Sequence, residues 1–180
     1  MIKNVLHPLL HLFIPHQCAG CGSDIMSRQQ VLCIHCINRL PVTSFHDHAG
    51  NPVEKIFWGR MPVAAASSYL YFSKDSVLQH IVHELKYKGN KELGTYIGRK
   101  MGEALLHAQR FKDIDALLPL PLFAARERKR GYNQAFILCQ GMAEVLSRPV
   151  LTKVIRRHTS SSTQTNKNRI DRWLNMQDKF

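Results

Sequence analysis

Two Cys-x2-Cys pairs constrain this chain more than any other feature of its sequence. Cys18 and Cys21 form the first pair, and Cys33 and Cys36 form the second pair after eleven intervening residues. Each pair can turn two thiolates toward one centre, and four thiolates complete the tetrahedral shell of a structural zinc ion. Because such a site has no open coordination position, the spacing predicts a zinc module with a structural role.

Other uses of these cysteines compete with zinc. Disulfide bonds are disfavoured because the chain has the features of a cytosolic protein, in which thiols stay reduced. A redox dithiol needs only one Cys-x2-Cys pair, so it does not explain why the chain has two. His16 and His35 lie nearby and could replace a ligand, but four cysteines already complete the shell. The fifth cysteine, Cys139, lies in an apolar helical stretch, which is more typical of a buried inert thiol than of a nucleophile.

The first fifteen residues contain an apolar run that is interrupted by His7, Pro8 and His11. No small-residue cleavage site follows, so the run differs from a secretory signal peptide. We expect a short amphipathic helix that docks on a neighbour. No apolar run approaches the roughly 20 residues of a membrane-spanning helix. The sequence therefore predicts a cytoplasmic protein without membrane insertion.

The charge of the chain is strongly positive and unevenly distributed. Among 180 residues, 25 Lys and Arg against 13 Asp and Glu give a net charge of +12. The segment 126–180 holds twelve basic and four acidic residues, which is two thirds of the surplus. Such a bias favours an anionic partner, either nucleic acid or a phosphorylated small molecule. A basic protein without a specific anionic partner is the alternative.

Three zones follow one another along the chain. Residues 1–40 hold the first helix and the cysteine pairs, residues 41–61 form a Pro- and Gly-punctuated linker, and residues 62–180 form a third zone. In this third zone, apolar runs predict strands over 62–72, 114–120 and 150–155. Helical spacing predicts helices from an N-cap at Ser73 to Lys88-Gly89, over 91–109 and over 133–146. Strands that alternate with helices predict a parallel α/β sheet.

A basic loop follows the predicted strand 114–120 and leads into the predicted helix 133–146. It contains Arg126, Arg128, Lys129 and Arg130 and runs into Gly131-Tyr132-Asn133-Gln134. Ligands of parallel α/β sheets bind beyond the carboxyl ends of the strands, and arginines near a helix N-terminus can hold phosphates. The alternative is a solvated charged loop. A polar stretch over residues 156–175 is either a mobile flap or a disordered linker. Its candidate residues for binding an anionic ligand are Arg156, Arg157, Gln164, Arg169 and Arg172.

Four segments in order along the chain resemble the ComF family of competence-associated, phosphoribosyltransferase-like proteins. The resemblance covers about residue 18 to the end. The first segment is the two cysteine pairs followed by Arg39-Leu40-Pro41. The other three are HELKYKGNKELG (83–94), LPLPLFAARERKRGYNQA (118–135) and TSSSTQTNKNRIDRWLN (159–175).

The resemblance implies a type I phosphoribosyltransferase-like parallel sheet behind a four-cysteine zinc finger. It implies a site for phosphoribosyl pyrophosphate, with Mg²⁺ in a complete chain, or for a similar phosphorylated small molecule. It also implies handling of single-stranded DNA in natural competence, together with a competence helicase or the uptake machinery. On this basis the phosphate ligands would be Arg128, Arg130, Asn133 and Gln134, with Arg169 and Arg172 on a flap over the site.

One departure from the family pattern limits these expectations. The family continues to an apolar strand with two acidic residues and a Thr/Gly-rich phosphate loop, which this sequence lacks up to Phe180. We therefore expect a C-terminally incomplete sheet with a partly exposed core, and no phosphoribosyl transfer by this chain alone. Two alternatives stay open. One is an active, amidophosphoribosyltransferase-like enzyme when the chain is complete. The other is a nucleic-acid-binding module in which Tyr132 and Trp173 stack on bases.

Overall fold

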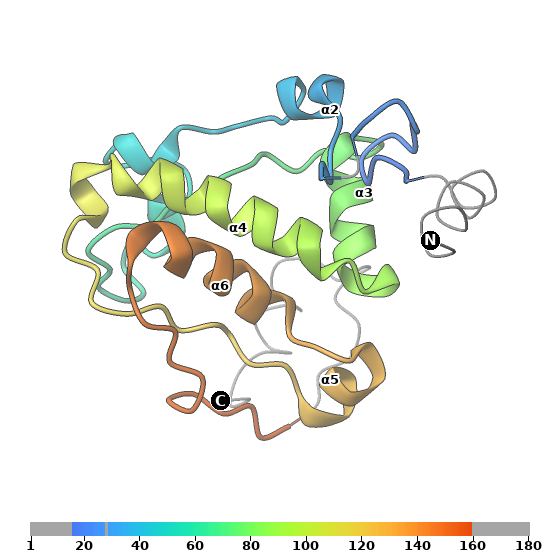
Figure 1. Ribbon diagram of the computed structural model, residues 1–180. Helices are drawn as coiled ribbons and strands as arrows, with labels where there is room; N and C mark the ends of the chain where they lie inside the picture. Colours follow the sequence, from blue (N-terminus) through green and yellow to red (C-terminus); the bar gives the residue numbers. More distant parts are fainter. Residues whose placement is uncertain (1–15, 28, 160–180) are drawn as a thin grey trace.

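The computed structural model describes residues 16–27 and 29–159 and is shown in Figure 1. The predicted first helix within residues 1–15, and the tail with Arg169, Arg172 and Trp173, lie outside the described residues. No helix in the described part combines the length and the apolar character needed to cross a membrane. The helical elements in chain order are α2 (Ile34–Asn38), η1 (Phe45–Asp47), η2 (Glu54–Ile56), α3 (Val77–His83), η3 (Glu84–Lys88), α4 (Lys91–Leu106), η4 (Gln109–Phe111), α5 (Ala124–Arg130) and α6 (Gln134–Leu146).

The two longest helices, α4 and α6, lie side by side and form the frame of the structure (Figure 1). Glycines bring their backbones into contact. A Cβ atom on Gly98 would meet the Leu138 carbonyl oxygen, and one on Gly141 would meet the Thr95 carbonyl oxygen. An ion pair between Arg99 and Glu144, with N and O 2.5 Å apart, also joins the two helices. The predictions of helices over 91–109 and 133–146 are confirmed with small changes at the ends.

The helix before α4 begins later than the sequence predicts and then widens. Its N-cap is Ser76, whose Oγ accepts a hydrogen bond from the Gln79 N–H at 3.3 Å and donates one to the Ser73 carbonyl at 2.7 Å. After α3, the chain continues as the π-helical turn η3. Gly89, with φ of +72°, ends η3, since glycine adopts this left-handed conformation without strain. The predicted end near Lys88-Gly89 is confirmed.

The predicted parallel sheet is wrong for the part of the chain that the structure describes. The segments 62–72, 114–120 and 150–155 form no strand there, and backbone pairing is limited to two isolated bridges. One bridge is antiparallel and joins Val42 to Leu70; the other is parallel and joins Leu117 to Val150. In the parallel bridge, the Leu117 N–H donates to the Pro149 carbonyl and the Leu151 N–H to the Leu117 carbonyl, both at 2.9 Å.

The local sequence explains why this pairing does not extend. Pro119, Pro121 and Pro149 have no N–H to donate to a ladder. A parallel strand is normally covered on both faces, whereas Leu118 and Leu120 are 43% and 56% exposed. The apolar runs therefore have strand composition, but they lack the neighbours and covering elements that a sheet requires. A phosphoribosyltransferase-like sheet is accordingly not part of the described fold.

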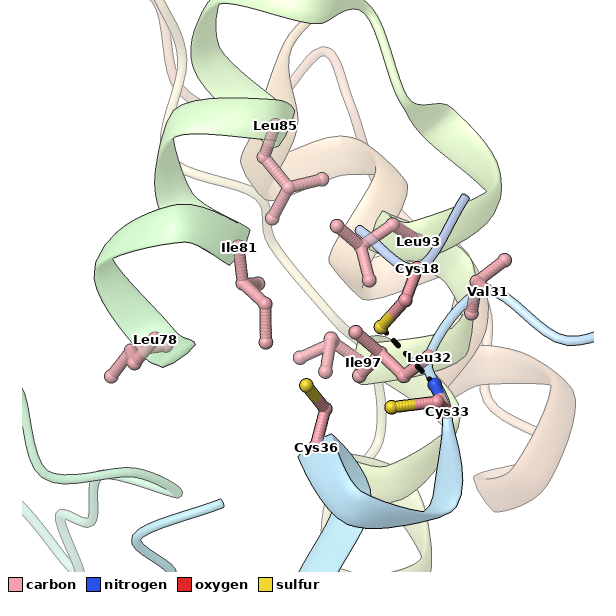
Figure 2. Packing of buried hydrophobic residues seen from close by; sticks show 10 residues of the cluster. All are labelled: Cys18, Val31, Leu32, Cys33, Cys36, Leu78, Ile81, Leu85, Leu93 and Ile97. Atoms are coloured by element: carbon pink, nitrogen blue, oxygen red, sulfur yellow. Dashed lines mark hydrogen bonds between the residues drawn. The ribbon is translucent and has the colours of Figure 1, made fainter. Parts of the chain in front are cut away.

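The cysteine segment and the helices share one hydrophobic core. Figure 2 shows this core, in which the cysteine side chains lie against α3, η3 and α4. The buried members are Cys18, Val31, Leu32, Cys33, Cys36, Leu78, Ile81, Leu85, Leu93 and Ile97. The division of the chain into residues 1–40, 41–61 and 62–180 stays a prediction, and this shared core joins the first of these zones to the third.

Two buried polar side chains fix the conformation of the segment predicted as a linker. The Asn51 Nδ2 donates to the carbonyls of Phe45, His48 and Ala66 at 3.1, 3.0 and 2.8 Å. The Glu54 carboxylate accepts hydrogen bonds from the Gly50 and Ala66 N–H groups. It also forms an ion pair with Arg110, with O and N 2.5 Å apart. The segment is thus tied to itself, to Ala66 and to Arg110 after α4.

A Glu54→Gln substitution is expected to lower stability at neutral pH and to flatten its dependence on acid. The Arg110 guanidinium lowers the pKa of Glu54 below its ordinary value. The ionised carboxylate therefore stabilises the fold fully above its unfolded pKa of about 4.3, and this contribution is lost as the pH falls through the lower folded pKa. Urea denaturation at a series of pH values measures the effect.

The matched control is Glu144→Gln, which removes the exposed ion pair with Arg99. Exposed pairs contribute little to stability, so this variant should keep the pH dependence of the unmodified chain. An identical pH dependence for Glu54→Gln and the unmodified chain would contradict the role of Glu54.

Candidate functional site

The four paired cysteines lie together, as their spacing predicts. Their sulfur atoms are all within 4.8 Å of one another, and the Cys21 and Cys33 sulfurs are 3.7 Å apart. Zinc with Zn–S bonds of about 2.3 Å in a tetrahedron places its sulfurs about 3.8 Å apart. In Figure 2, the sulfurs of Cys18, Cys33 and Cys36 point toward a common space. The four thiols could hold a metal ion, and the geometry is compatible with zinc.

The surroundings of the four thiols favour a cation between them. Burial raises the pKa of the Cys18 thiol, but N–H donors from Cys33, Cys21 and Gly20 more than offset this and bring it to about 6. Burial and the neighbouring thiols Cys21 and Cys18 raise the pKa of Cys36 strongly. Four thiolates at this spacing repel one another, so they ionise together only when a cation balances their charge.

Backbone groups hold the cysteine loops in this arrangement. The N–H groups of Cys33 and Gly20 donate to the Cys18 sulfur at 3.2 and 3.4 Å. A Cβ atom on Gly20 would lie 2.8 Å from the Cys36 sulfur, so the close approach of the loop to this sulfur favours glycine. The described cysteines are all free thiols. The structure thus brings together all four residues that the sequence predicts as metal ligands.

The two nearby histidines make other contacts. The His16 Nε2 lies 2.6 Å from the Gln30 carbonyl oxygen, and the Arg39 guanidinium lies 3.2 Å from the His35 Nε2. Neither is part of the four-residue group that could hold a metal. Cys139 is also separate from this group and lies half-buried on α6, where burial raises the pKa of its thiol.

The basic cluster after residue 122 forms the helix α5, where the sequence predicts a loop. Its residues Ala-Ala-Arg-Glu-Arg-Lys-Arg are mostly strong helix formers, which explains the difference. Gly131, with φ of +82°, ends the helix. Arg128, Lys129 and Arg130 occupy its last turn, where positive charge interacts favourably with the helix dipole. Arg128 and Lys129 are exposed and Arg130 is half-buried.

The residues after Gly131 bind backbone groups of other segments. The Tyr132 hydroxyl and the Gln134 amide both donate to the Leu85 carbonyl in η3, at 2.5 and 3.3 Å. The Asn133 amide donates to the Leu120 carbonyl at 2.9 Å, and its oxygen accepts from the Ala135 N–H at the start of α6. These contacts join three parts of the chain: the turn η3, the segment that precedes α5, and the helix α6.

The structure therefore places the predicted phosphate ligands in two groups. Arg128, which is exposed, and Arg130, which is half-buried, lie in the last turn of α5, whereas Asn133 and Gln134 make internal hydrogen bonds next to this helix. Arg169 and Arg172 lie outside the described residues. A hollow of about 510 Å³ lined by Glu54, Trp58 and 59–63 includes none of the predicted ligands. The assignment of a phosphate site to these residues stays a prediction.

Sequence reasoning missed the contacts that connect α5 to η3. The Lys91 Nζ lies 5.4 Å from the centre of the Tyr132 ring, and burial raises the pKa of the Tyr132 hydroxyl. The only indication in the sequence that this region has a special role is the Lys-Tyr-Lys-Gly pattern within the segment 83–94. No local pattern reveals that the Leu85 carbonyl accepts two hydrogen bonds from residues more than forty positions later.

Comparison with known proteins finds relatives that carry the names competence protein and DNA utilization protein. Competence protein F of Haemophilus influenzae is 27% identical over 175 residues, which cover 95% of this chain and 72% of that protein. DNA utilization protein YhgH of Escherichia coli is 26% identical over 151 residues, and this chain spans only 62% of its length. The Salmonella typhi protein of the same name is 30% identical over 90 residues, or 40% of its length. No family model and no solved structure matches the chain.

Proposed function

Because its ordered motifs and its relatives make this chain a ComF-family protein, we propose that it handles single-stranded DNA during DNA uptake or use. The relatives carry the names competence protein and DNA utilization protein, and the chain spans 72% and 62% of the first two. The observation that carries the proposal is the helix α5, whose last turn presents Arg128, Lys129 and Arg130. Cooperation with a competence helicase or with the uptake machinery, in the cytoplasm, is part of the same proposal.

The position of α5 suits contact with a phosphate backbone. Its cations lie on a short helix whose following residues are hydrogen-bonded to Leu85 and Leu120, so the charges are held at a defined place. Arginine and lysine side chains that neutralise DNA phosphates release counterions, which gives affinity without dependence on sequence. A protein that takes up or uses DNA of any sequence needs this kind of binding.

We further propose that the four-cysteine group holds one zinc ion with a structural role. The group has the residue types and the sulfur spacing that tetrahedral zinc requires. Since three of the four cysteines, Cys18, Cys33 and Cys36, belong to the core shared with α3 and α4, the metal would stabilise the helical part of the chain. Catalysis by the metal is not part of the proposal, because four protein ligands leave no open position.

A phosphorylated small molecule is the second proposed ligand of the same residues. The observation in its favour is that only Gly131, Tyr132 and the N-cap Asn133 separate Arg130 from the N-terminus of α6, which adds N–H groups and a favourable dipole. Phosphoribosyl pyrophosphate with Mg²⁺ is the ligand that the family resemblance implies. Asn133 and Gln134 would then act by holding the segments in place, since their amides bind backbone carbonyls.

A double substitution Arg128→Ala with Arg130→Ala is expected to weaken binding of single-stranded DNA roughly tenfold or more at low salt. Each phosphate contact contributes about 0.7 to the slope of log affinity against log salt for single strands, so the slope should fall by about 1.4. Fluorescence anisotropy of a labelled oligothymidylate between about 50 and 200 mM salt measures both quantities.

The matched control is Lys74→Ala with Lys112→Ala, which removes two exposed charges outside α5. This control should keep most of the affinity of the unmodified chain. Equal losses in the two double variants would mean that only net charge matters and would contradict a site on α5. Competition by phosphoribosyl pyrophosphate with Mg²⁺ in the same assay tests whether the two proposed ligands share these residues.

A further inference from the structure

We propose that the DNA surface extends from α5 onto the π-helical turn η3, where Tyr87 provides a stacking platform for a base of the single strand. This inference rests on the proposed function. It adds a second chemical element to the cations of α5, namely an exposed aromatic ring between two lysines. Non-specific single-strand sites combine these two elements, because every base has an aromatic face.

The aromatic ring of Tyr87, within the π-helical turn η3, is largely exposed. Tyr87 is 71% exposed, whereas Leu85, two residues earlier, is 7% exposed and belongs to the core. The neighbours Lys86 and Lys88 are exposed as well. The turn therefore presents one aromatic ring between two lysines, of which Lys88 is ion-paired with Glu84. An exposed ring beside a lysine is the composition of a site that stacks on a base and attracts its phosphates.

Local contacts hold Tyr87 in a defined position. Its ring packs against the His83 ring with centroids 5.0 Å apart and a 42° angle between the planes. The Lys88 Nζ forms an ion pair with Glu84 at 2.8 Å, and Gly89 ends the turn in a left-handed conformation. π-helical turns are rare and occur frequently at functional sites. A ring that is already oriented loses less entropy when it stacks on a base.

The turn η3 and the helix α5 are joined through one buried tyrosine. Tyr132 donates to the Leu85 carbonyl, its ring contacts the Lys91 ammonium, and it follows the last residue of α5 by two positions. Tyr132 is 6% exposed, so this connection is internal. Since α5 and η3 are both fixed to Tyr132, the spacing between the cations and the Tyr87 ring is set by the fold.

This arrangement predicts a preference for single strands. In duplex DNA the faces of the bases are stacked on one another, so Tyr87 has no free face to contact. The cations of α5 would contact either form through the backbone. Tyr87 should therefore contribute to affinity only when unpaired bases are present.

The test is a Tyr87→Ala substitution measured with three probes by fluorescence anisotropy. The probes are a labelled oligothymidylate of about 20 nucleotides, an abasic strand of equal length and the matching duplex. Stacking contributes about 1–3 kcal/mol per base, which corresponds to a loss of between about fivefold and about 150-fold for the oligothymidylate. Affinities for the abasic strand and the duplex should not change. Tyr87→Phe, which keeps an aromatic ring, should bind the oligothymidylate like the unmodified chain.

Phe72→Ala is the matched control, because Phe72 is 64% exposed and lies before α3, outside η3. It should leave all three affinities unchanged. A second readout is photocrosslinking to an oligonucleotide with 5-iodouracil, which should attach to the peptide that contains Tyr87. Unchanged oligothymidylate affinity in Tyr87→Ala, or an equal loss on the abasic strand, overturns the inference but leaves the proposed function standing. No single-strand binding by the unmodified chain overturns both.

Discussion

A Cys21→Ser variant is expected to lose its zinc and much of its stability, although Cys21 is exposed. Substitutions of exposed side chains usually change the free energy of unfolding by no more than about 0.5 kcal/mol. Cys21 differs because its sulfur lies 3.7 Å from that of Cys33, within the four-thiol group. Binding of structural zinc contributes roughly 10–16 kcal/mol to the folding of zinc-finger peptides. We expect the loss of one ligand to cost about 4 kcal/mol or more.

The measurement combines elemental analysis with urea denaturation followed by the helical circular dichroism signal. The unmodified chain should contain one zinc per chain, and a chelator should lower its stability to that of Cys21→Ser. Helical signal should be lost in this experiment, because the buried ligand Cys36 packs with Ile81 of α3 and Leu93 of α4 in one core.

Cys139→Ser is the control for this prediction. Cys139 is a free thiol on α6 that does not belong to the metal group, so the variant should keep its zinc. Zinc content near zero in reduced, metal-replete unmodified protein would contradict the metal site itself. Full zinc content in Cys21→Ser would contradict the role of Cys21 as a ligand.

The features that the sequence predicts well depend on residues close together in the chain. The two Cys-x2-Cys pairs need only local turns to present their thiols, and the structure brings all four together. The helices α4 and α6 are predicted by apolar spacing alone, and the structure adds their N-caps Asn90 and Asn133, whose side chains accept hydrogen bonds from the first turns. Apolar spacing is a property of a short segment, so it can be read without knowledge of the fold.

The features that the sequence predicts poorly depend on distant partners. The segment 114–120 has the composition of a strand, but Leu117 pairs only once, with Val150. The family resemblance implies Asn133 as a phosphate ligand, whereas the fold uses its amide to bind the Leu120 carbonyl. The importance of Leu85 lies in its carbonyl oxygen, which every residue has. Such roles arise from tertiary contacts that no local pattern specifies.

A Gly141→Ala substitution is expected to destabilise the chain strongly, although the same substitution would stabilise an isolated helix. Alanine is favoured over glycine within a helix by about 1 kcal/mol. Here the new methyl group would collide with the Thr95 carbonyl oxygen and lie 2.8 Å from the Arg99 backbone nitrogen. These atoms belong to the backbone of α4, so they cannot move without separating the two helices. We expect a net cost of about 3 kcal/mol, at the upper end of the range for overpacked cores.

Urea denaturation of graded variants separates the clash from helix propensity. Gly102→Ala should cost less, because its nearest neighbours are the Val145 Cβ at 3.0 Å and the Met142 carbonyl at 3.1 Å. Gln140→Ala, at the exposed position before Gly141, should leave stability unchanged or raise it slightly. Higher stability in Gly141→Ala than in the unmodified chain would contradict close contact of the two backbones. Because Asn133 is the N-cap of α6 and Gln134 is its first residue, separation of α4 and α6 should also weaken the contacts of those residues with Leu120 and Leu85. The Gly141→Ala variant should therefore lose single-strand affinity under conditions in which it is still folded.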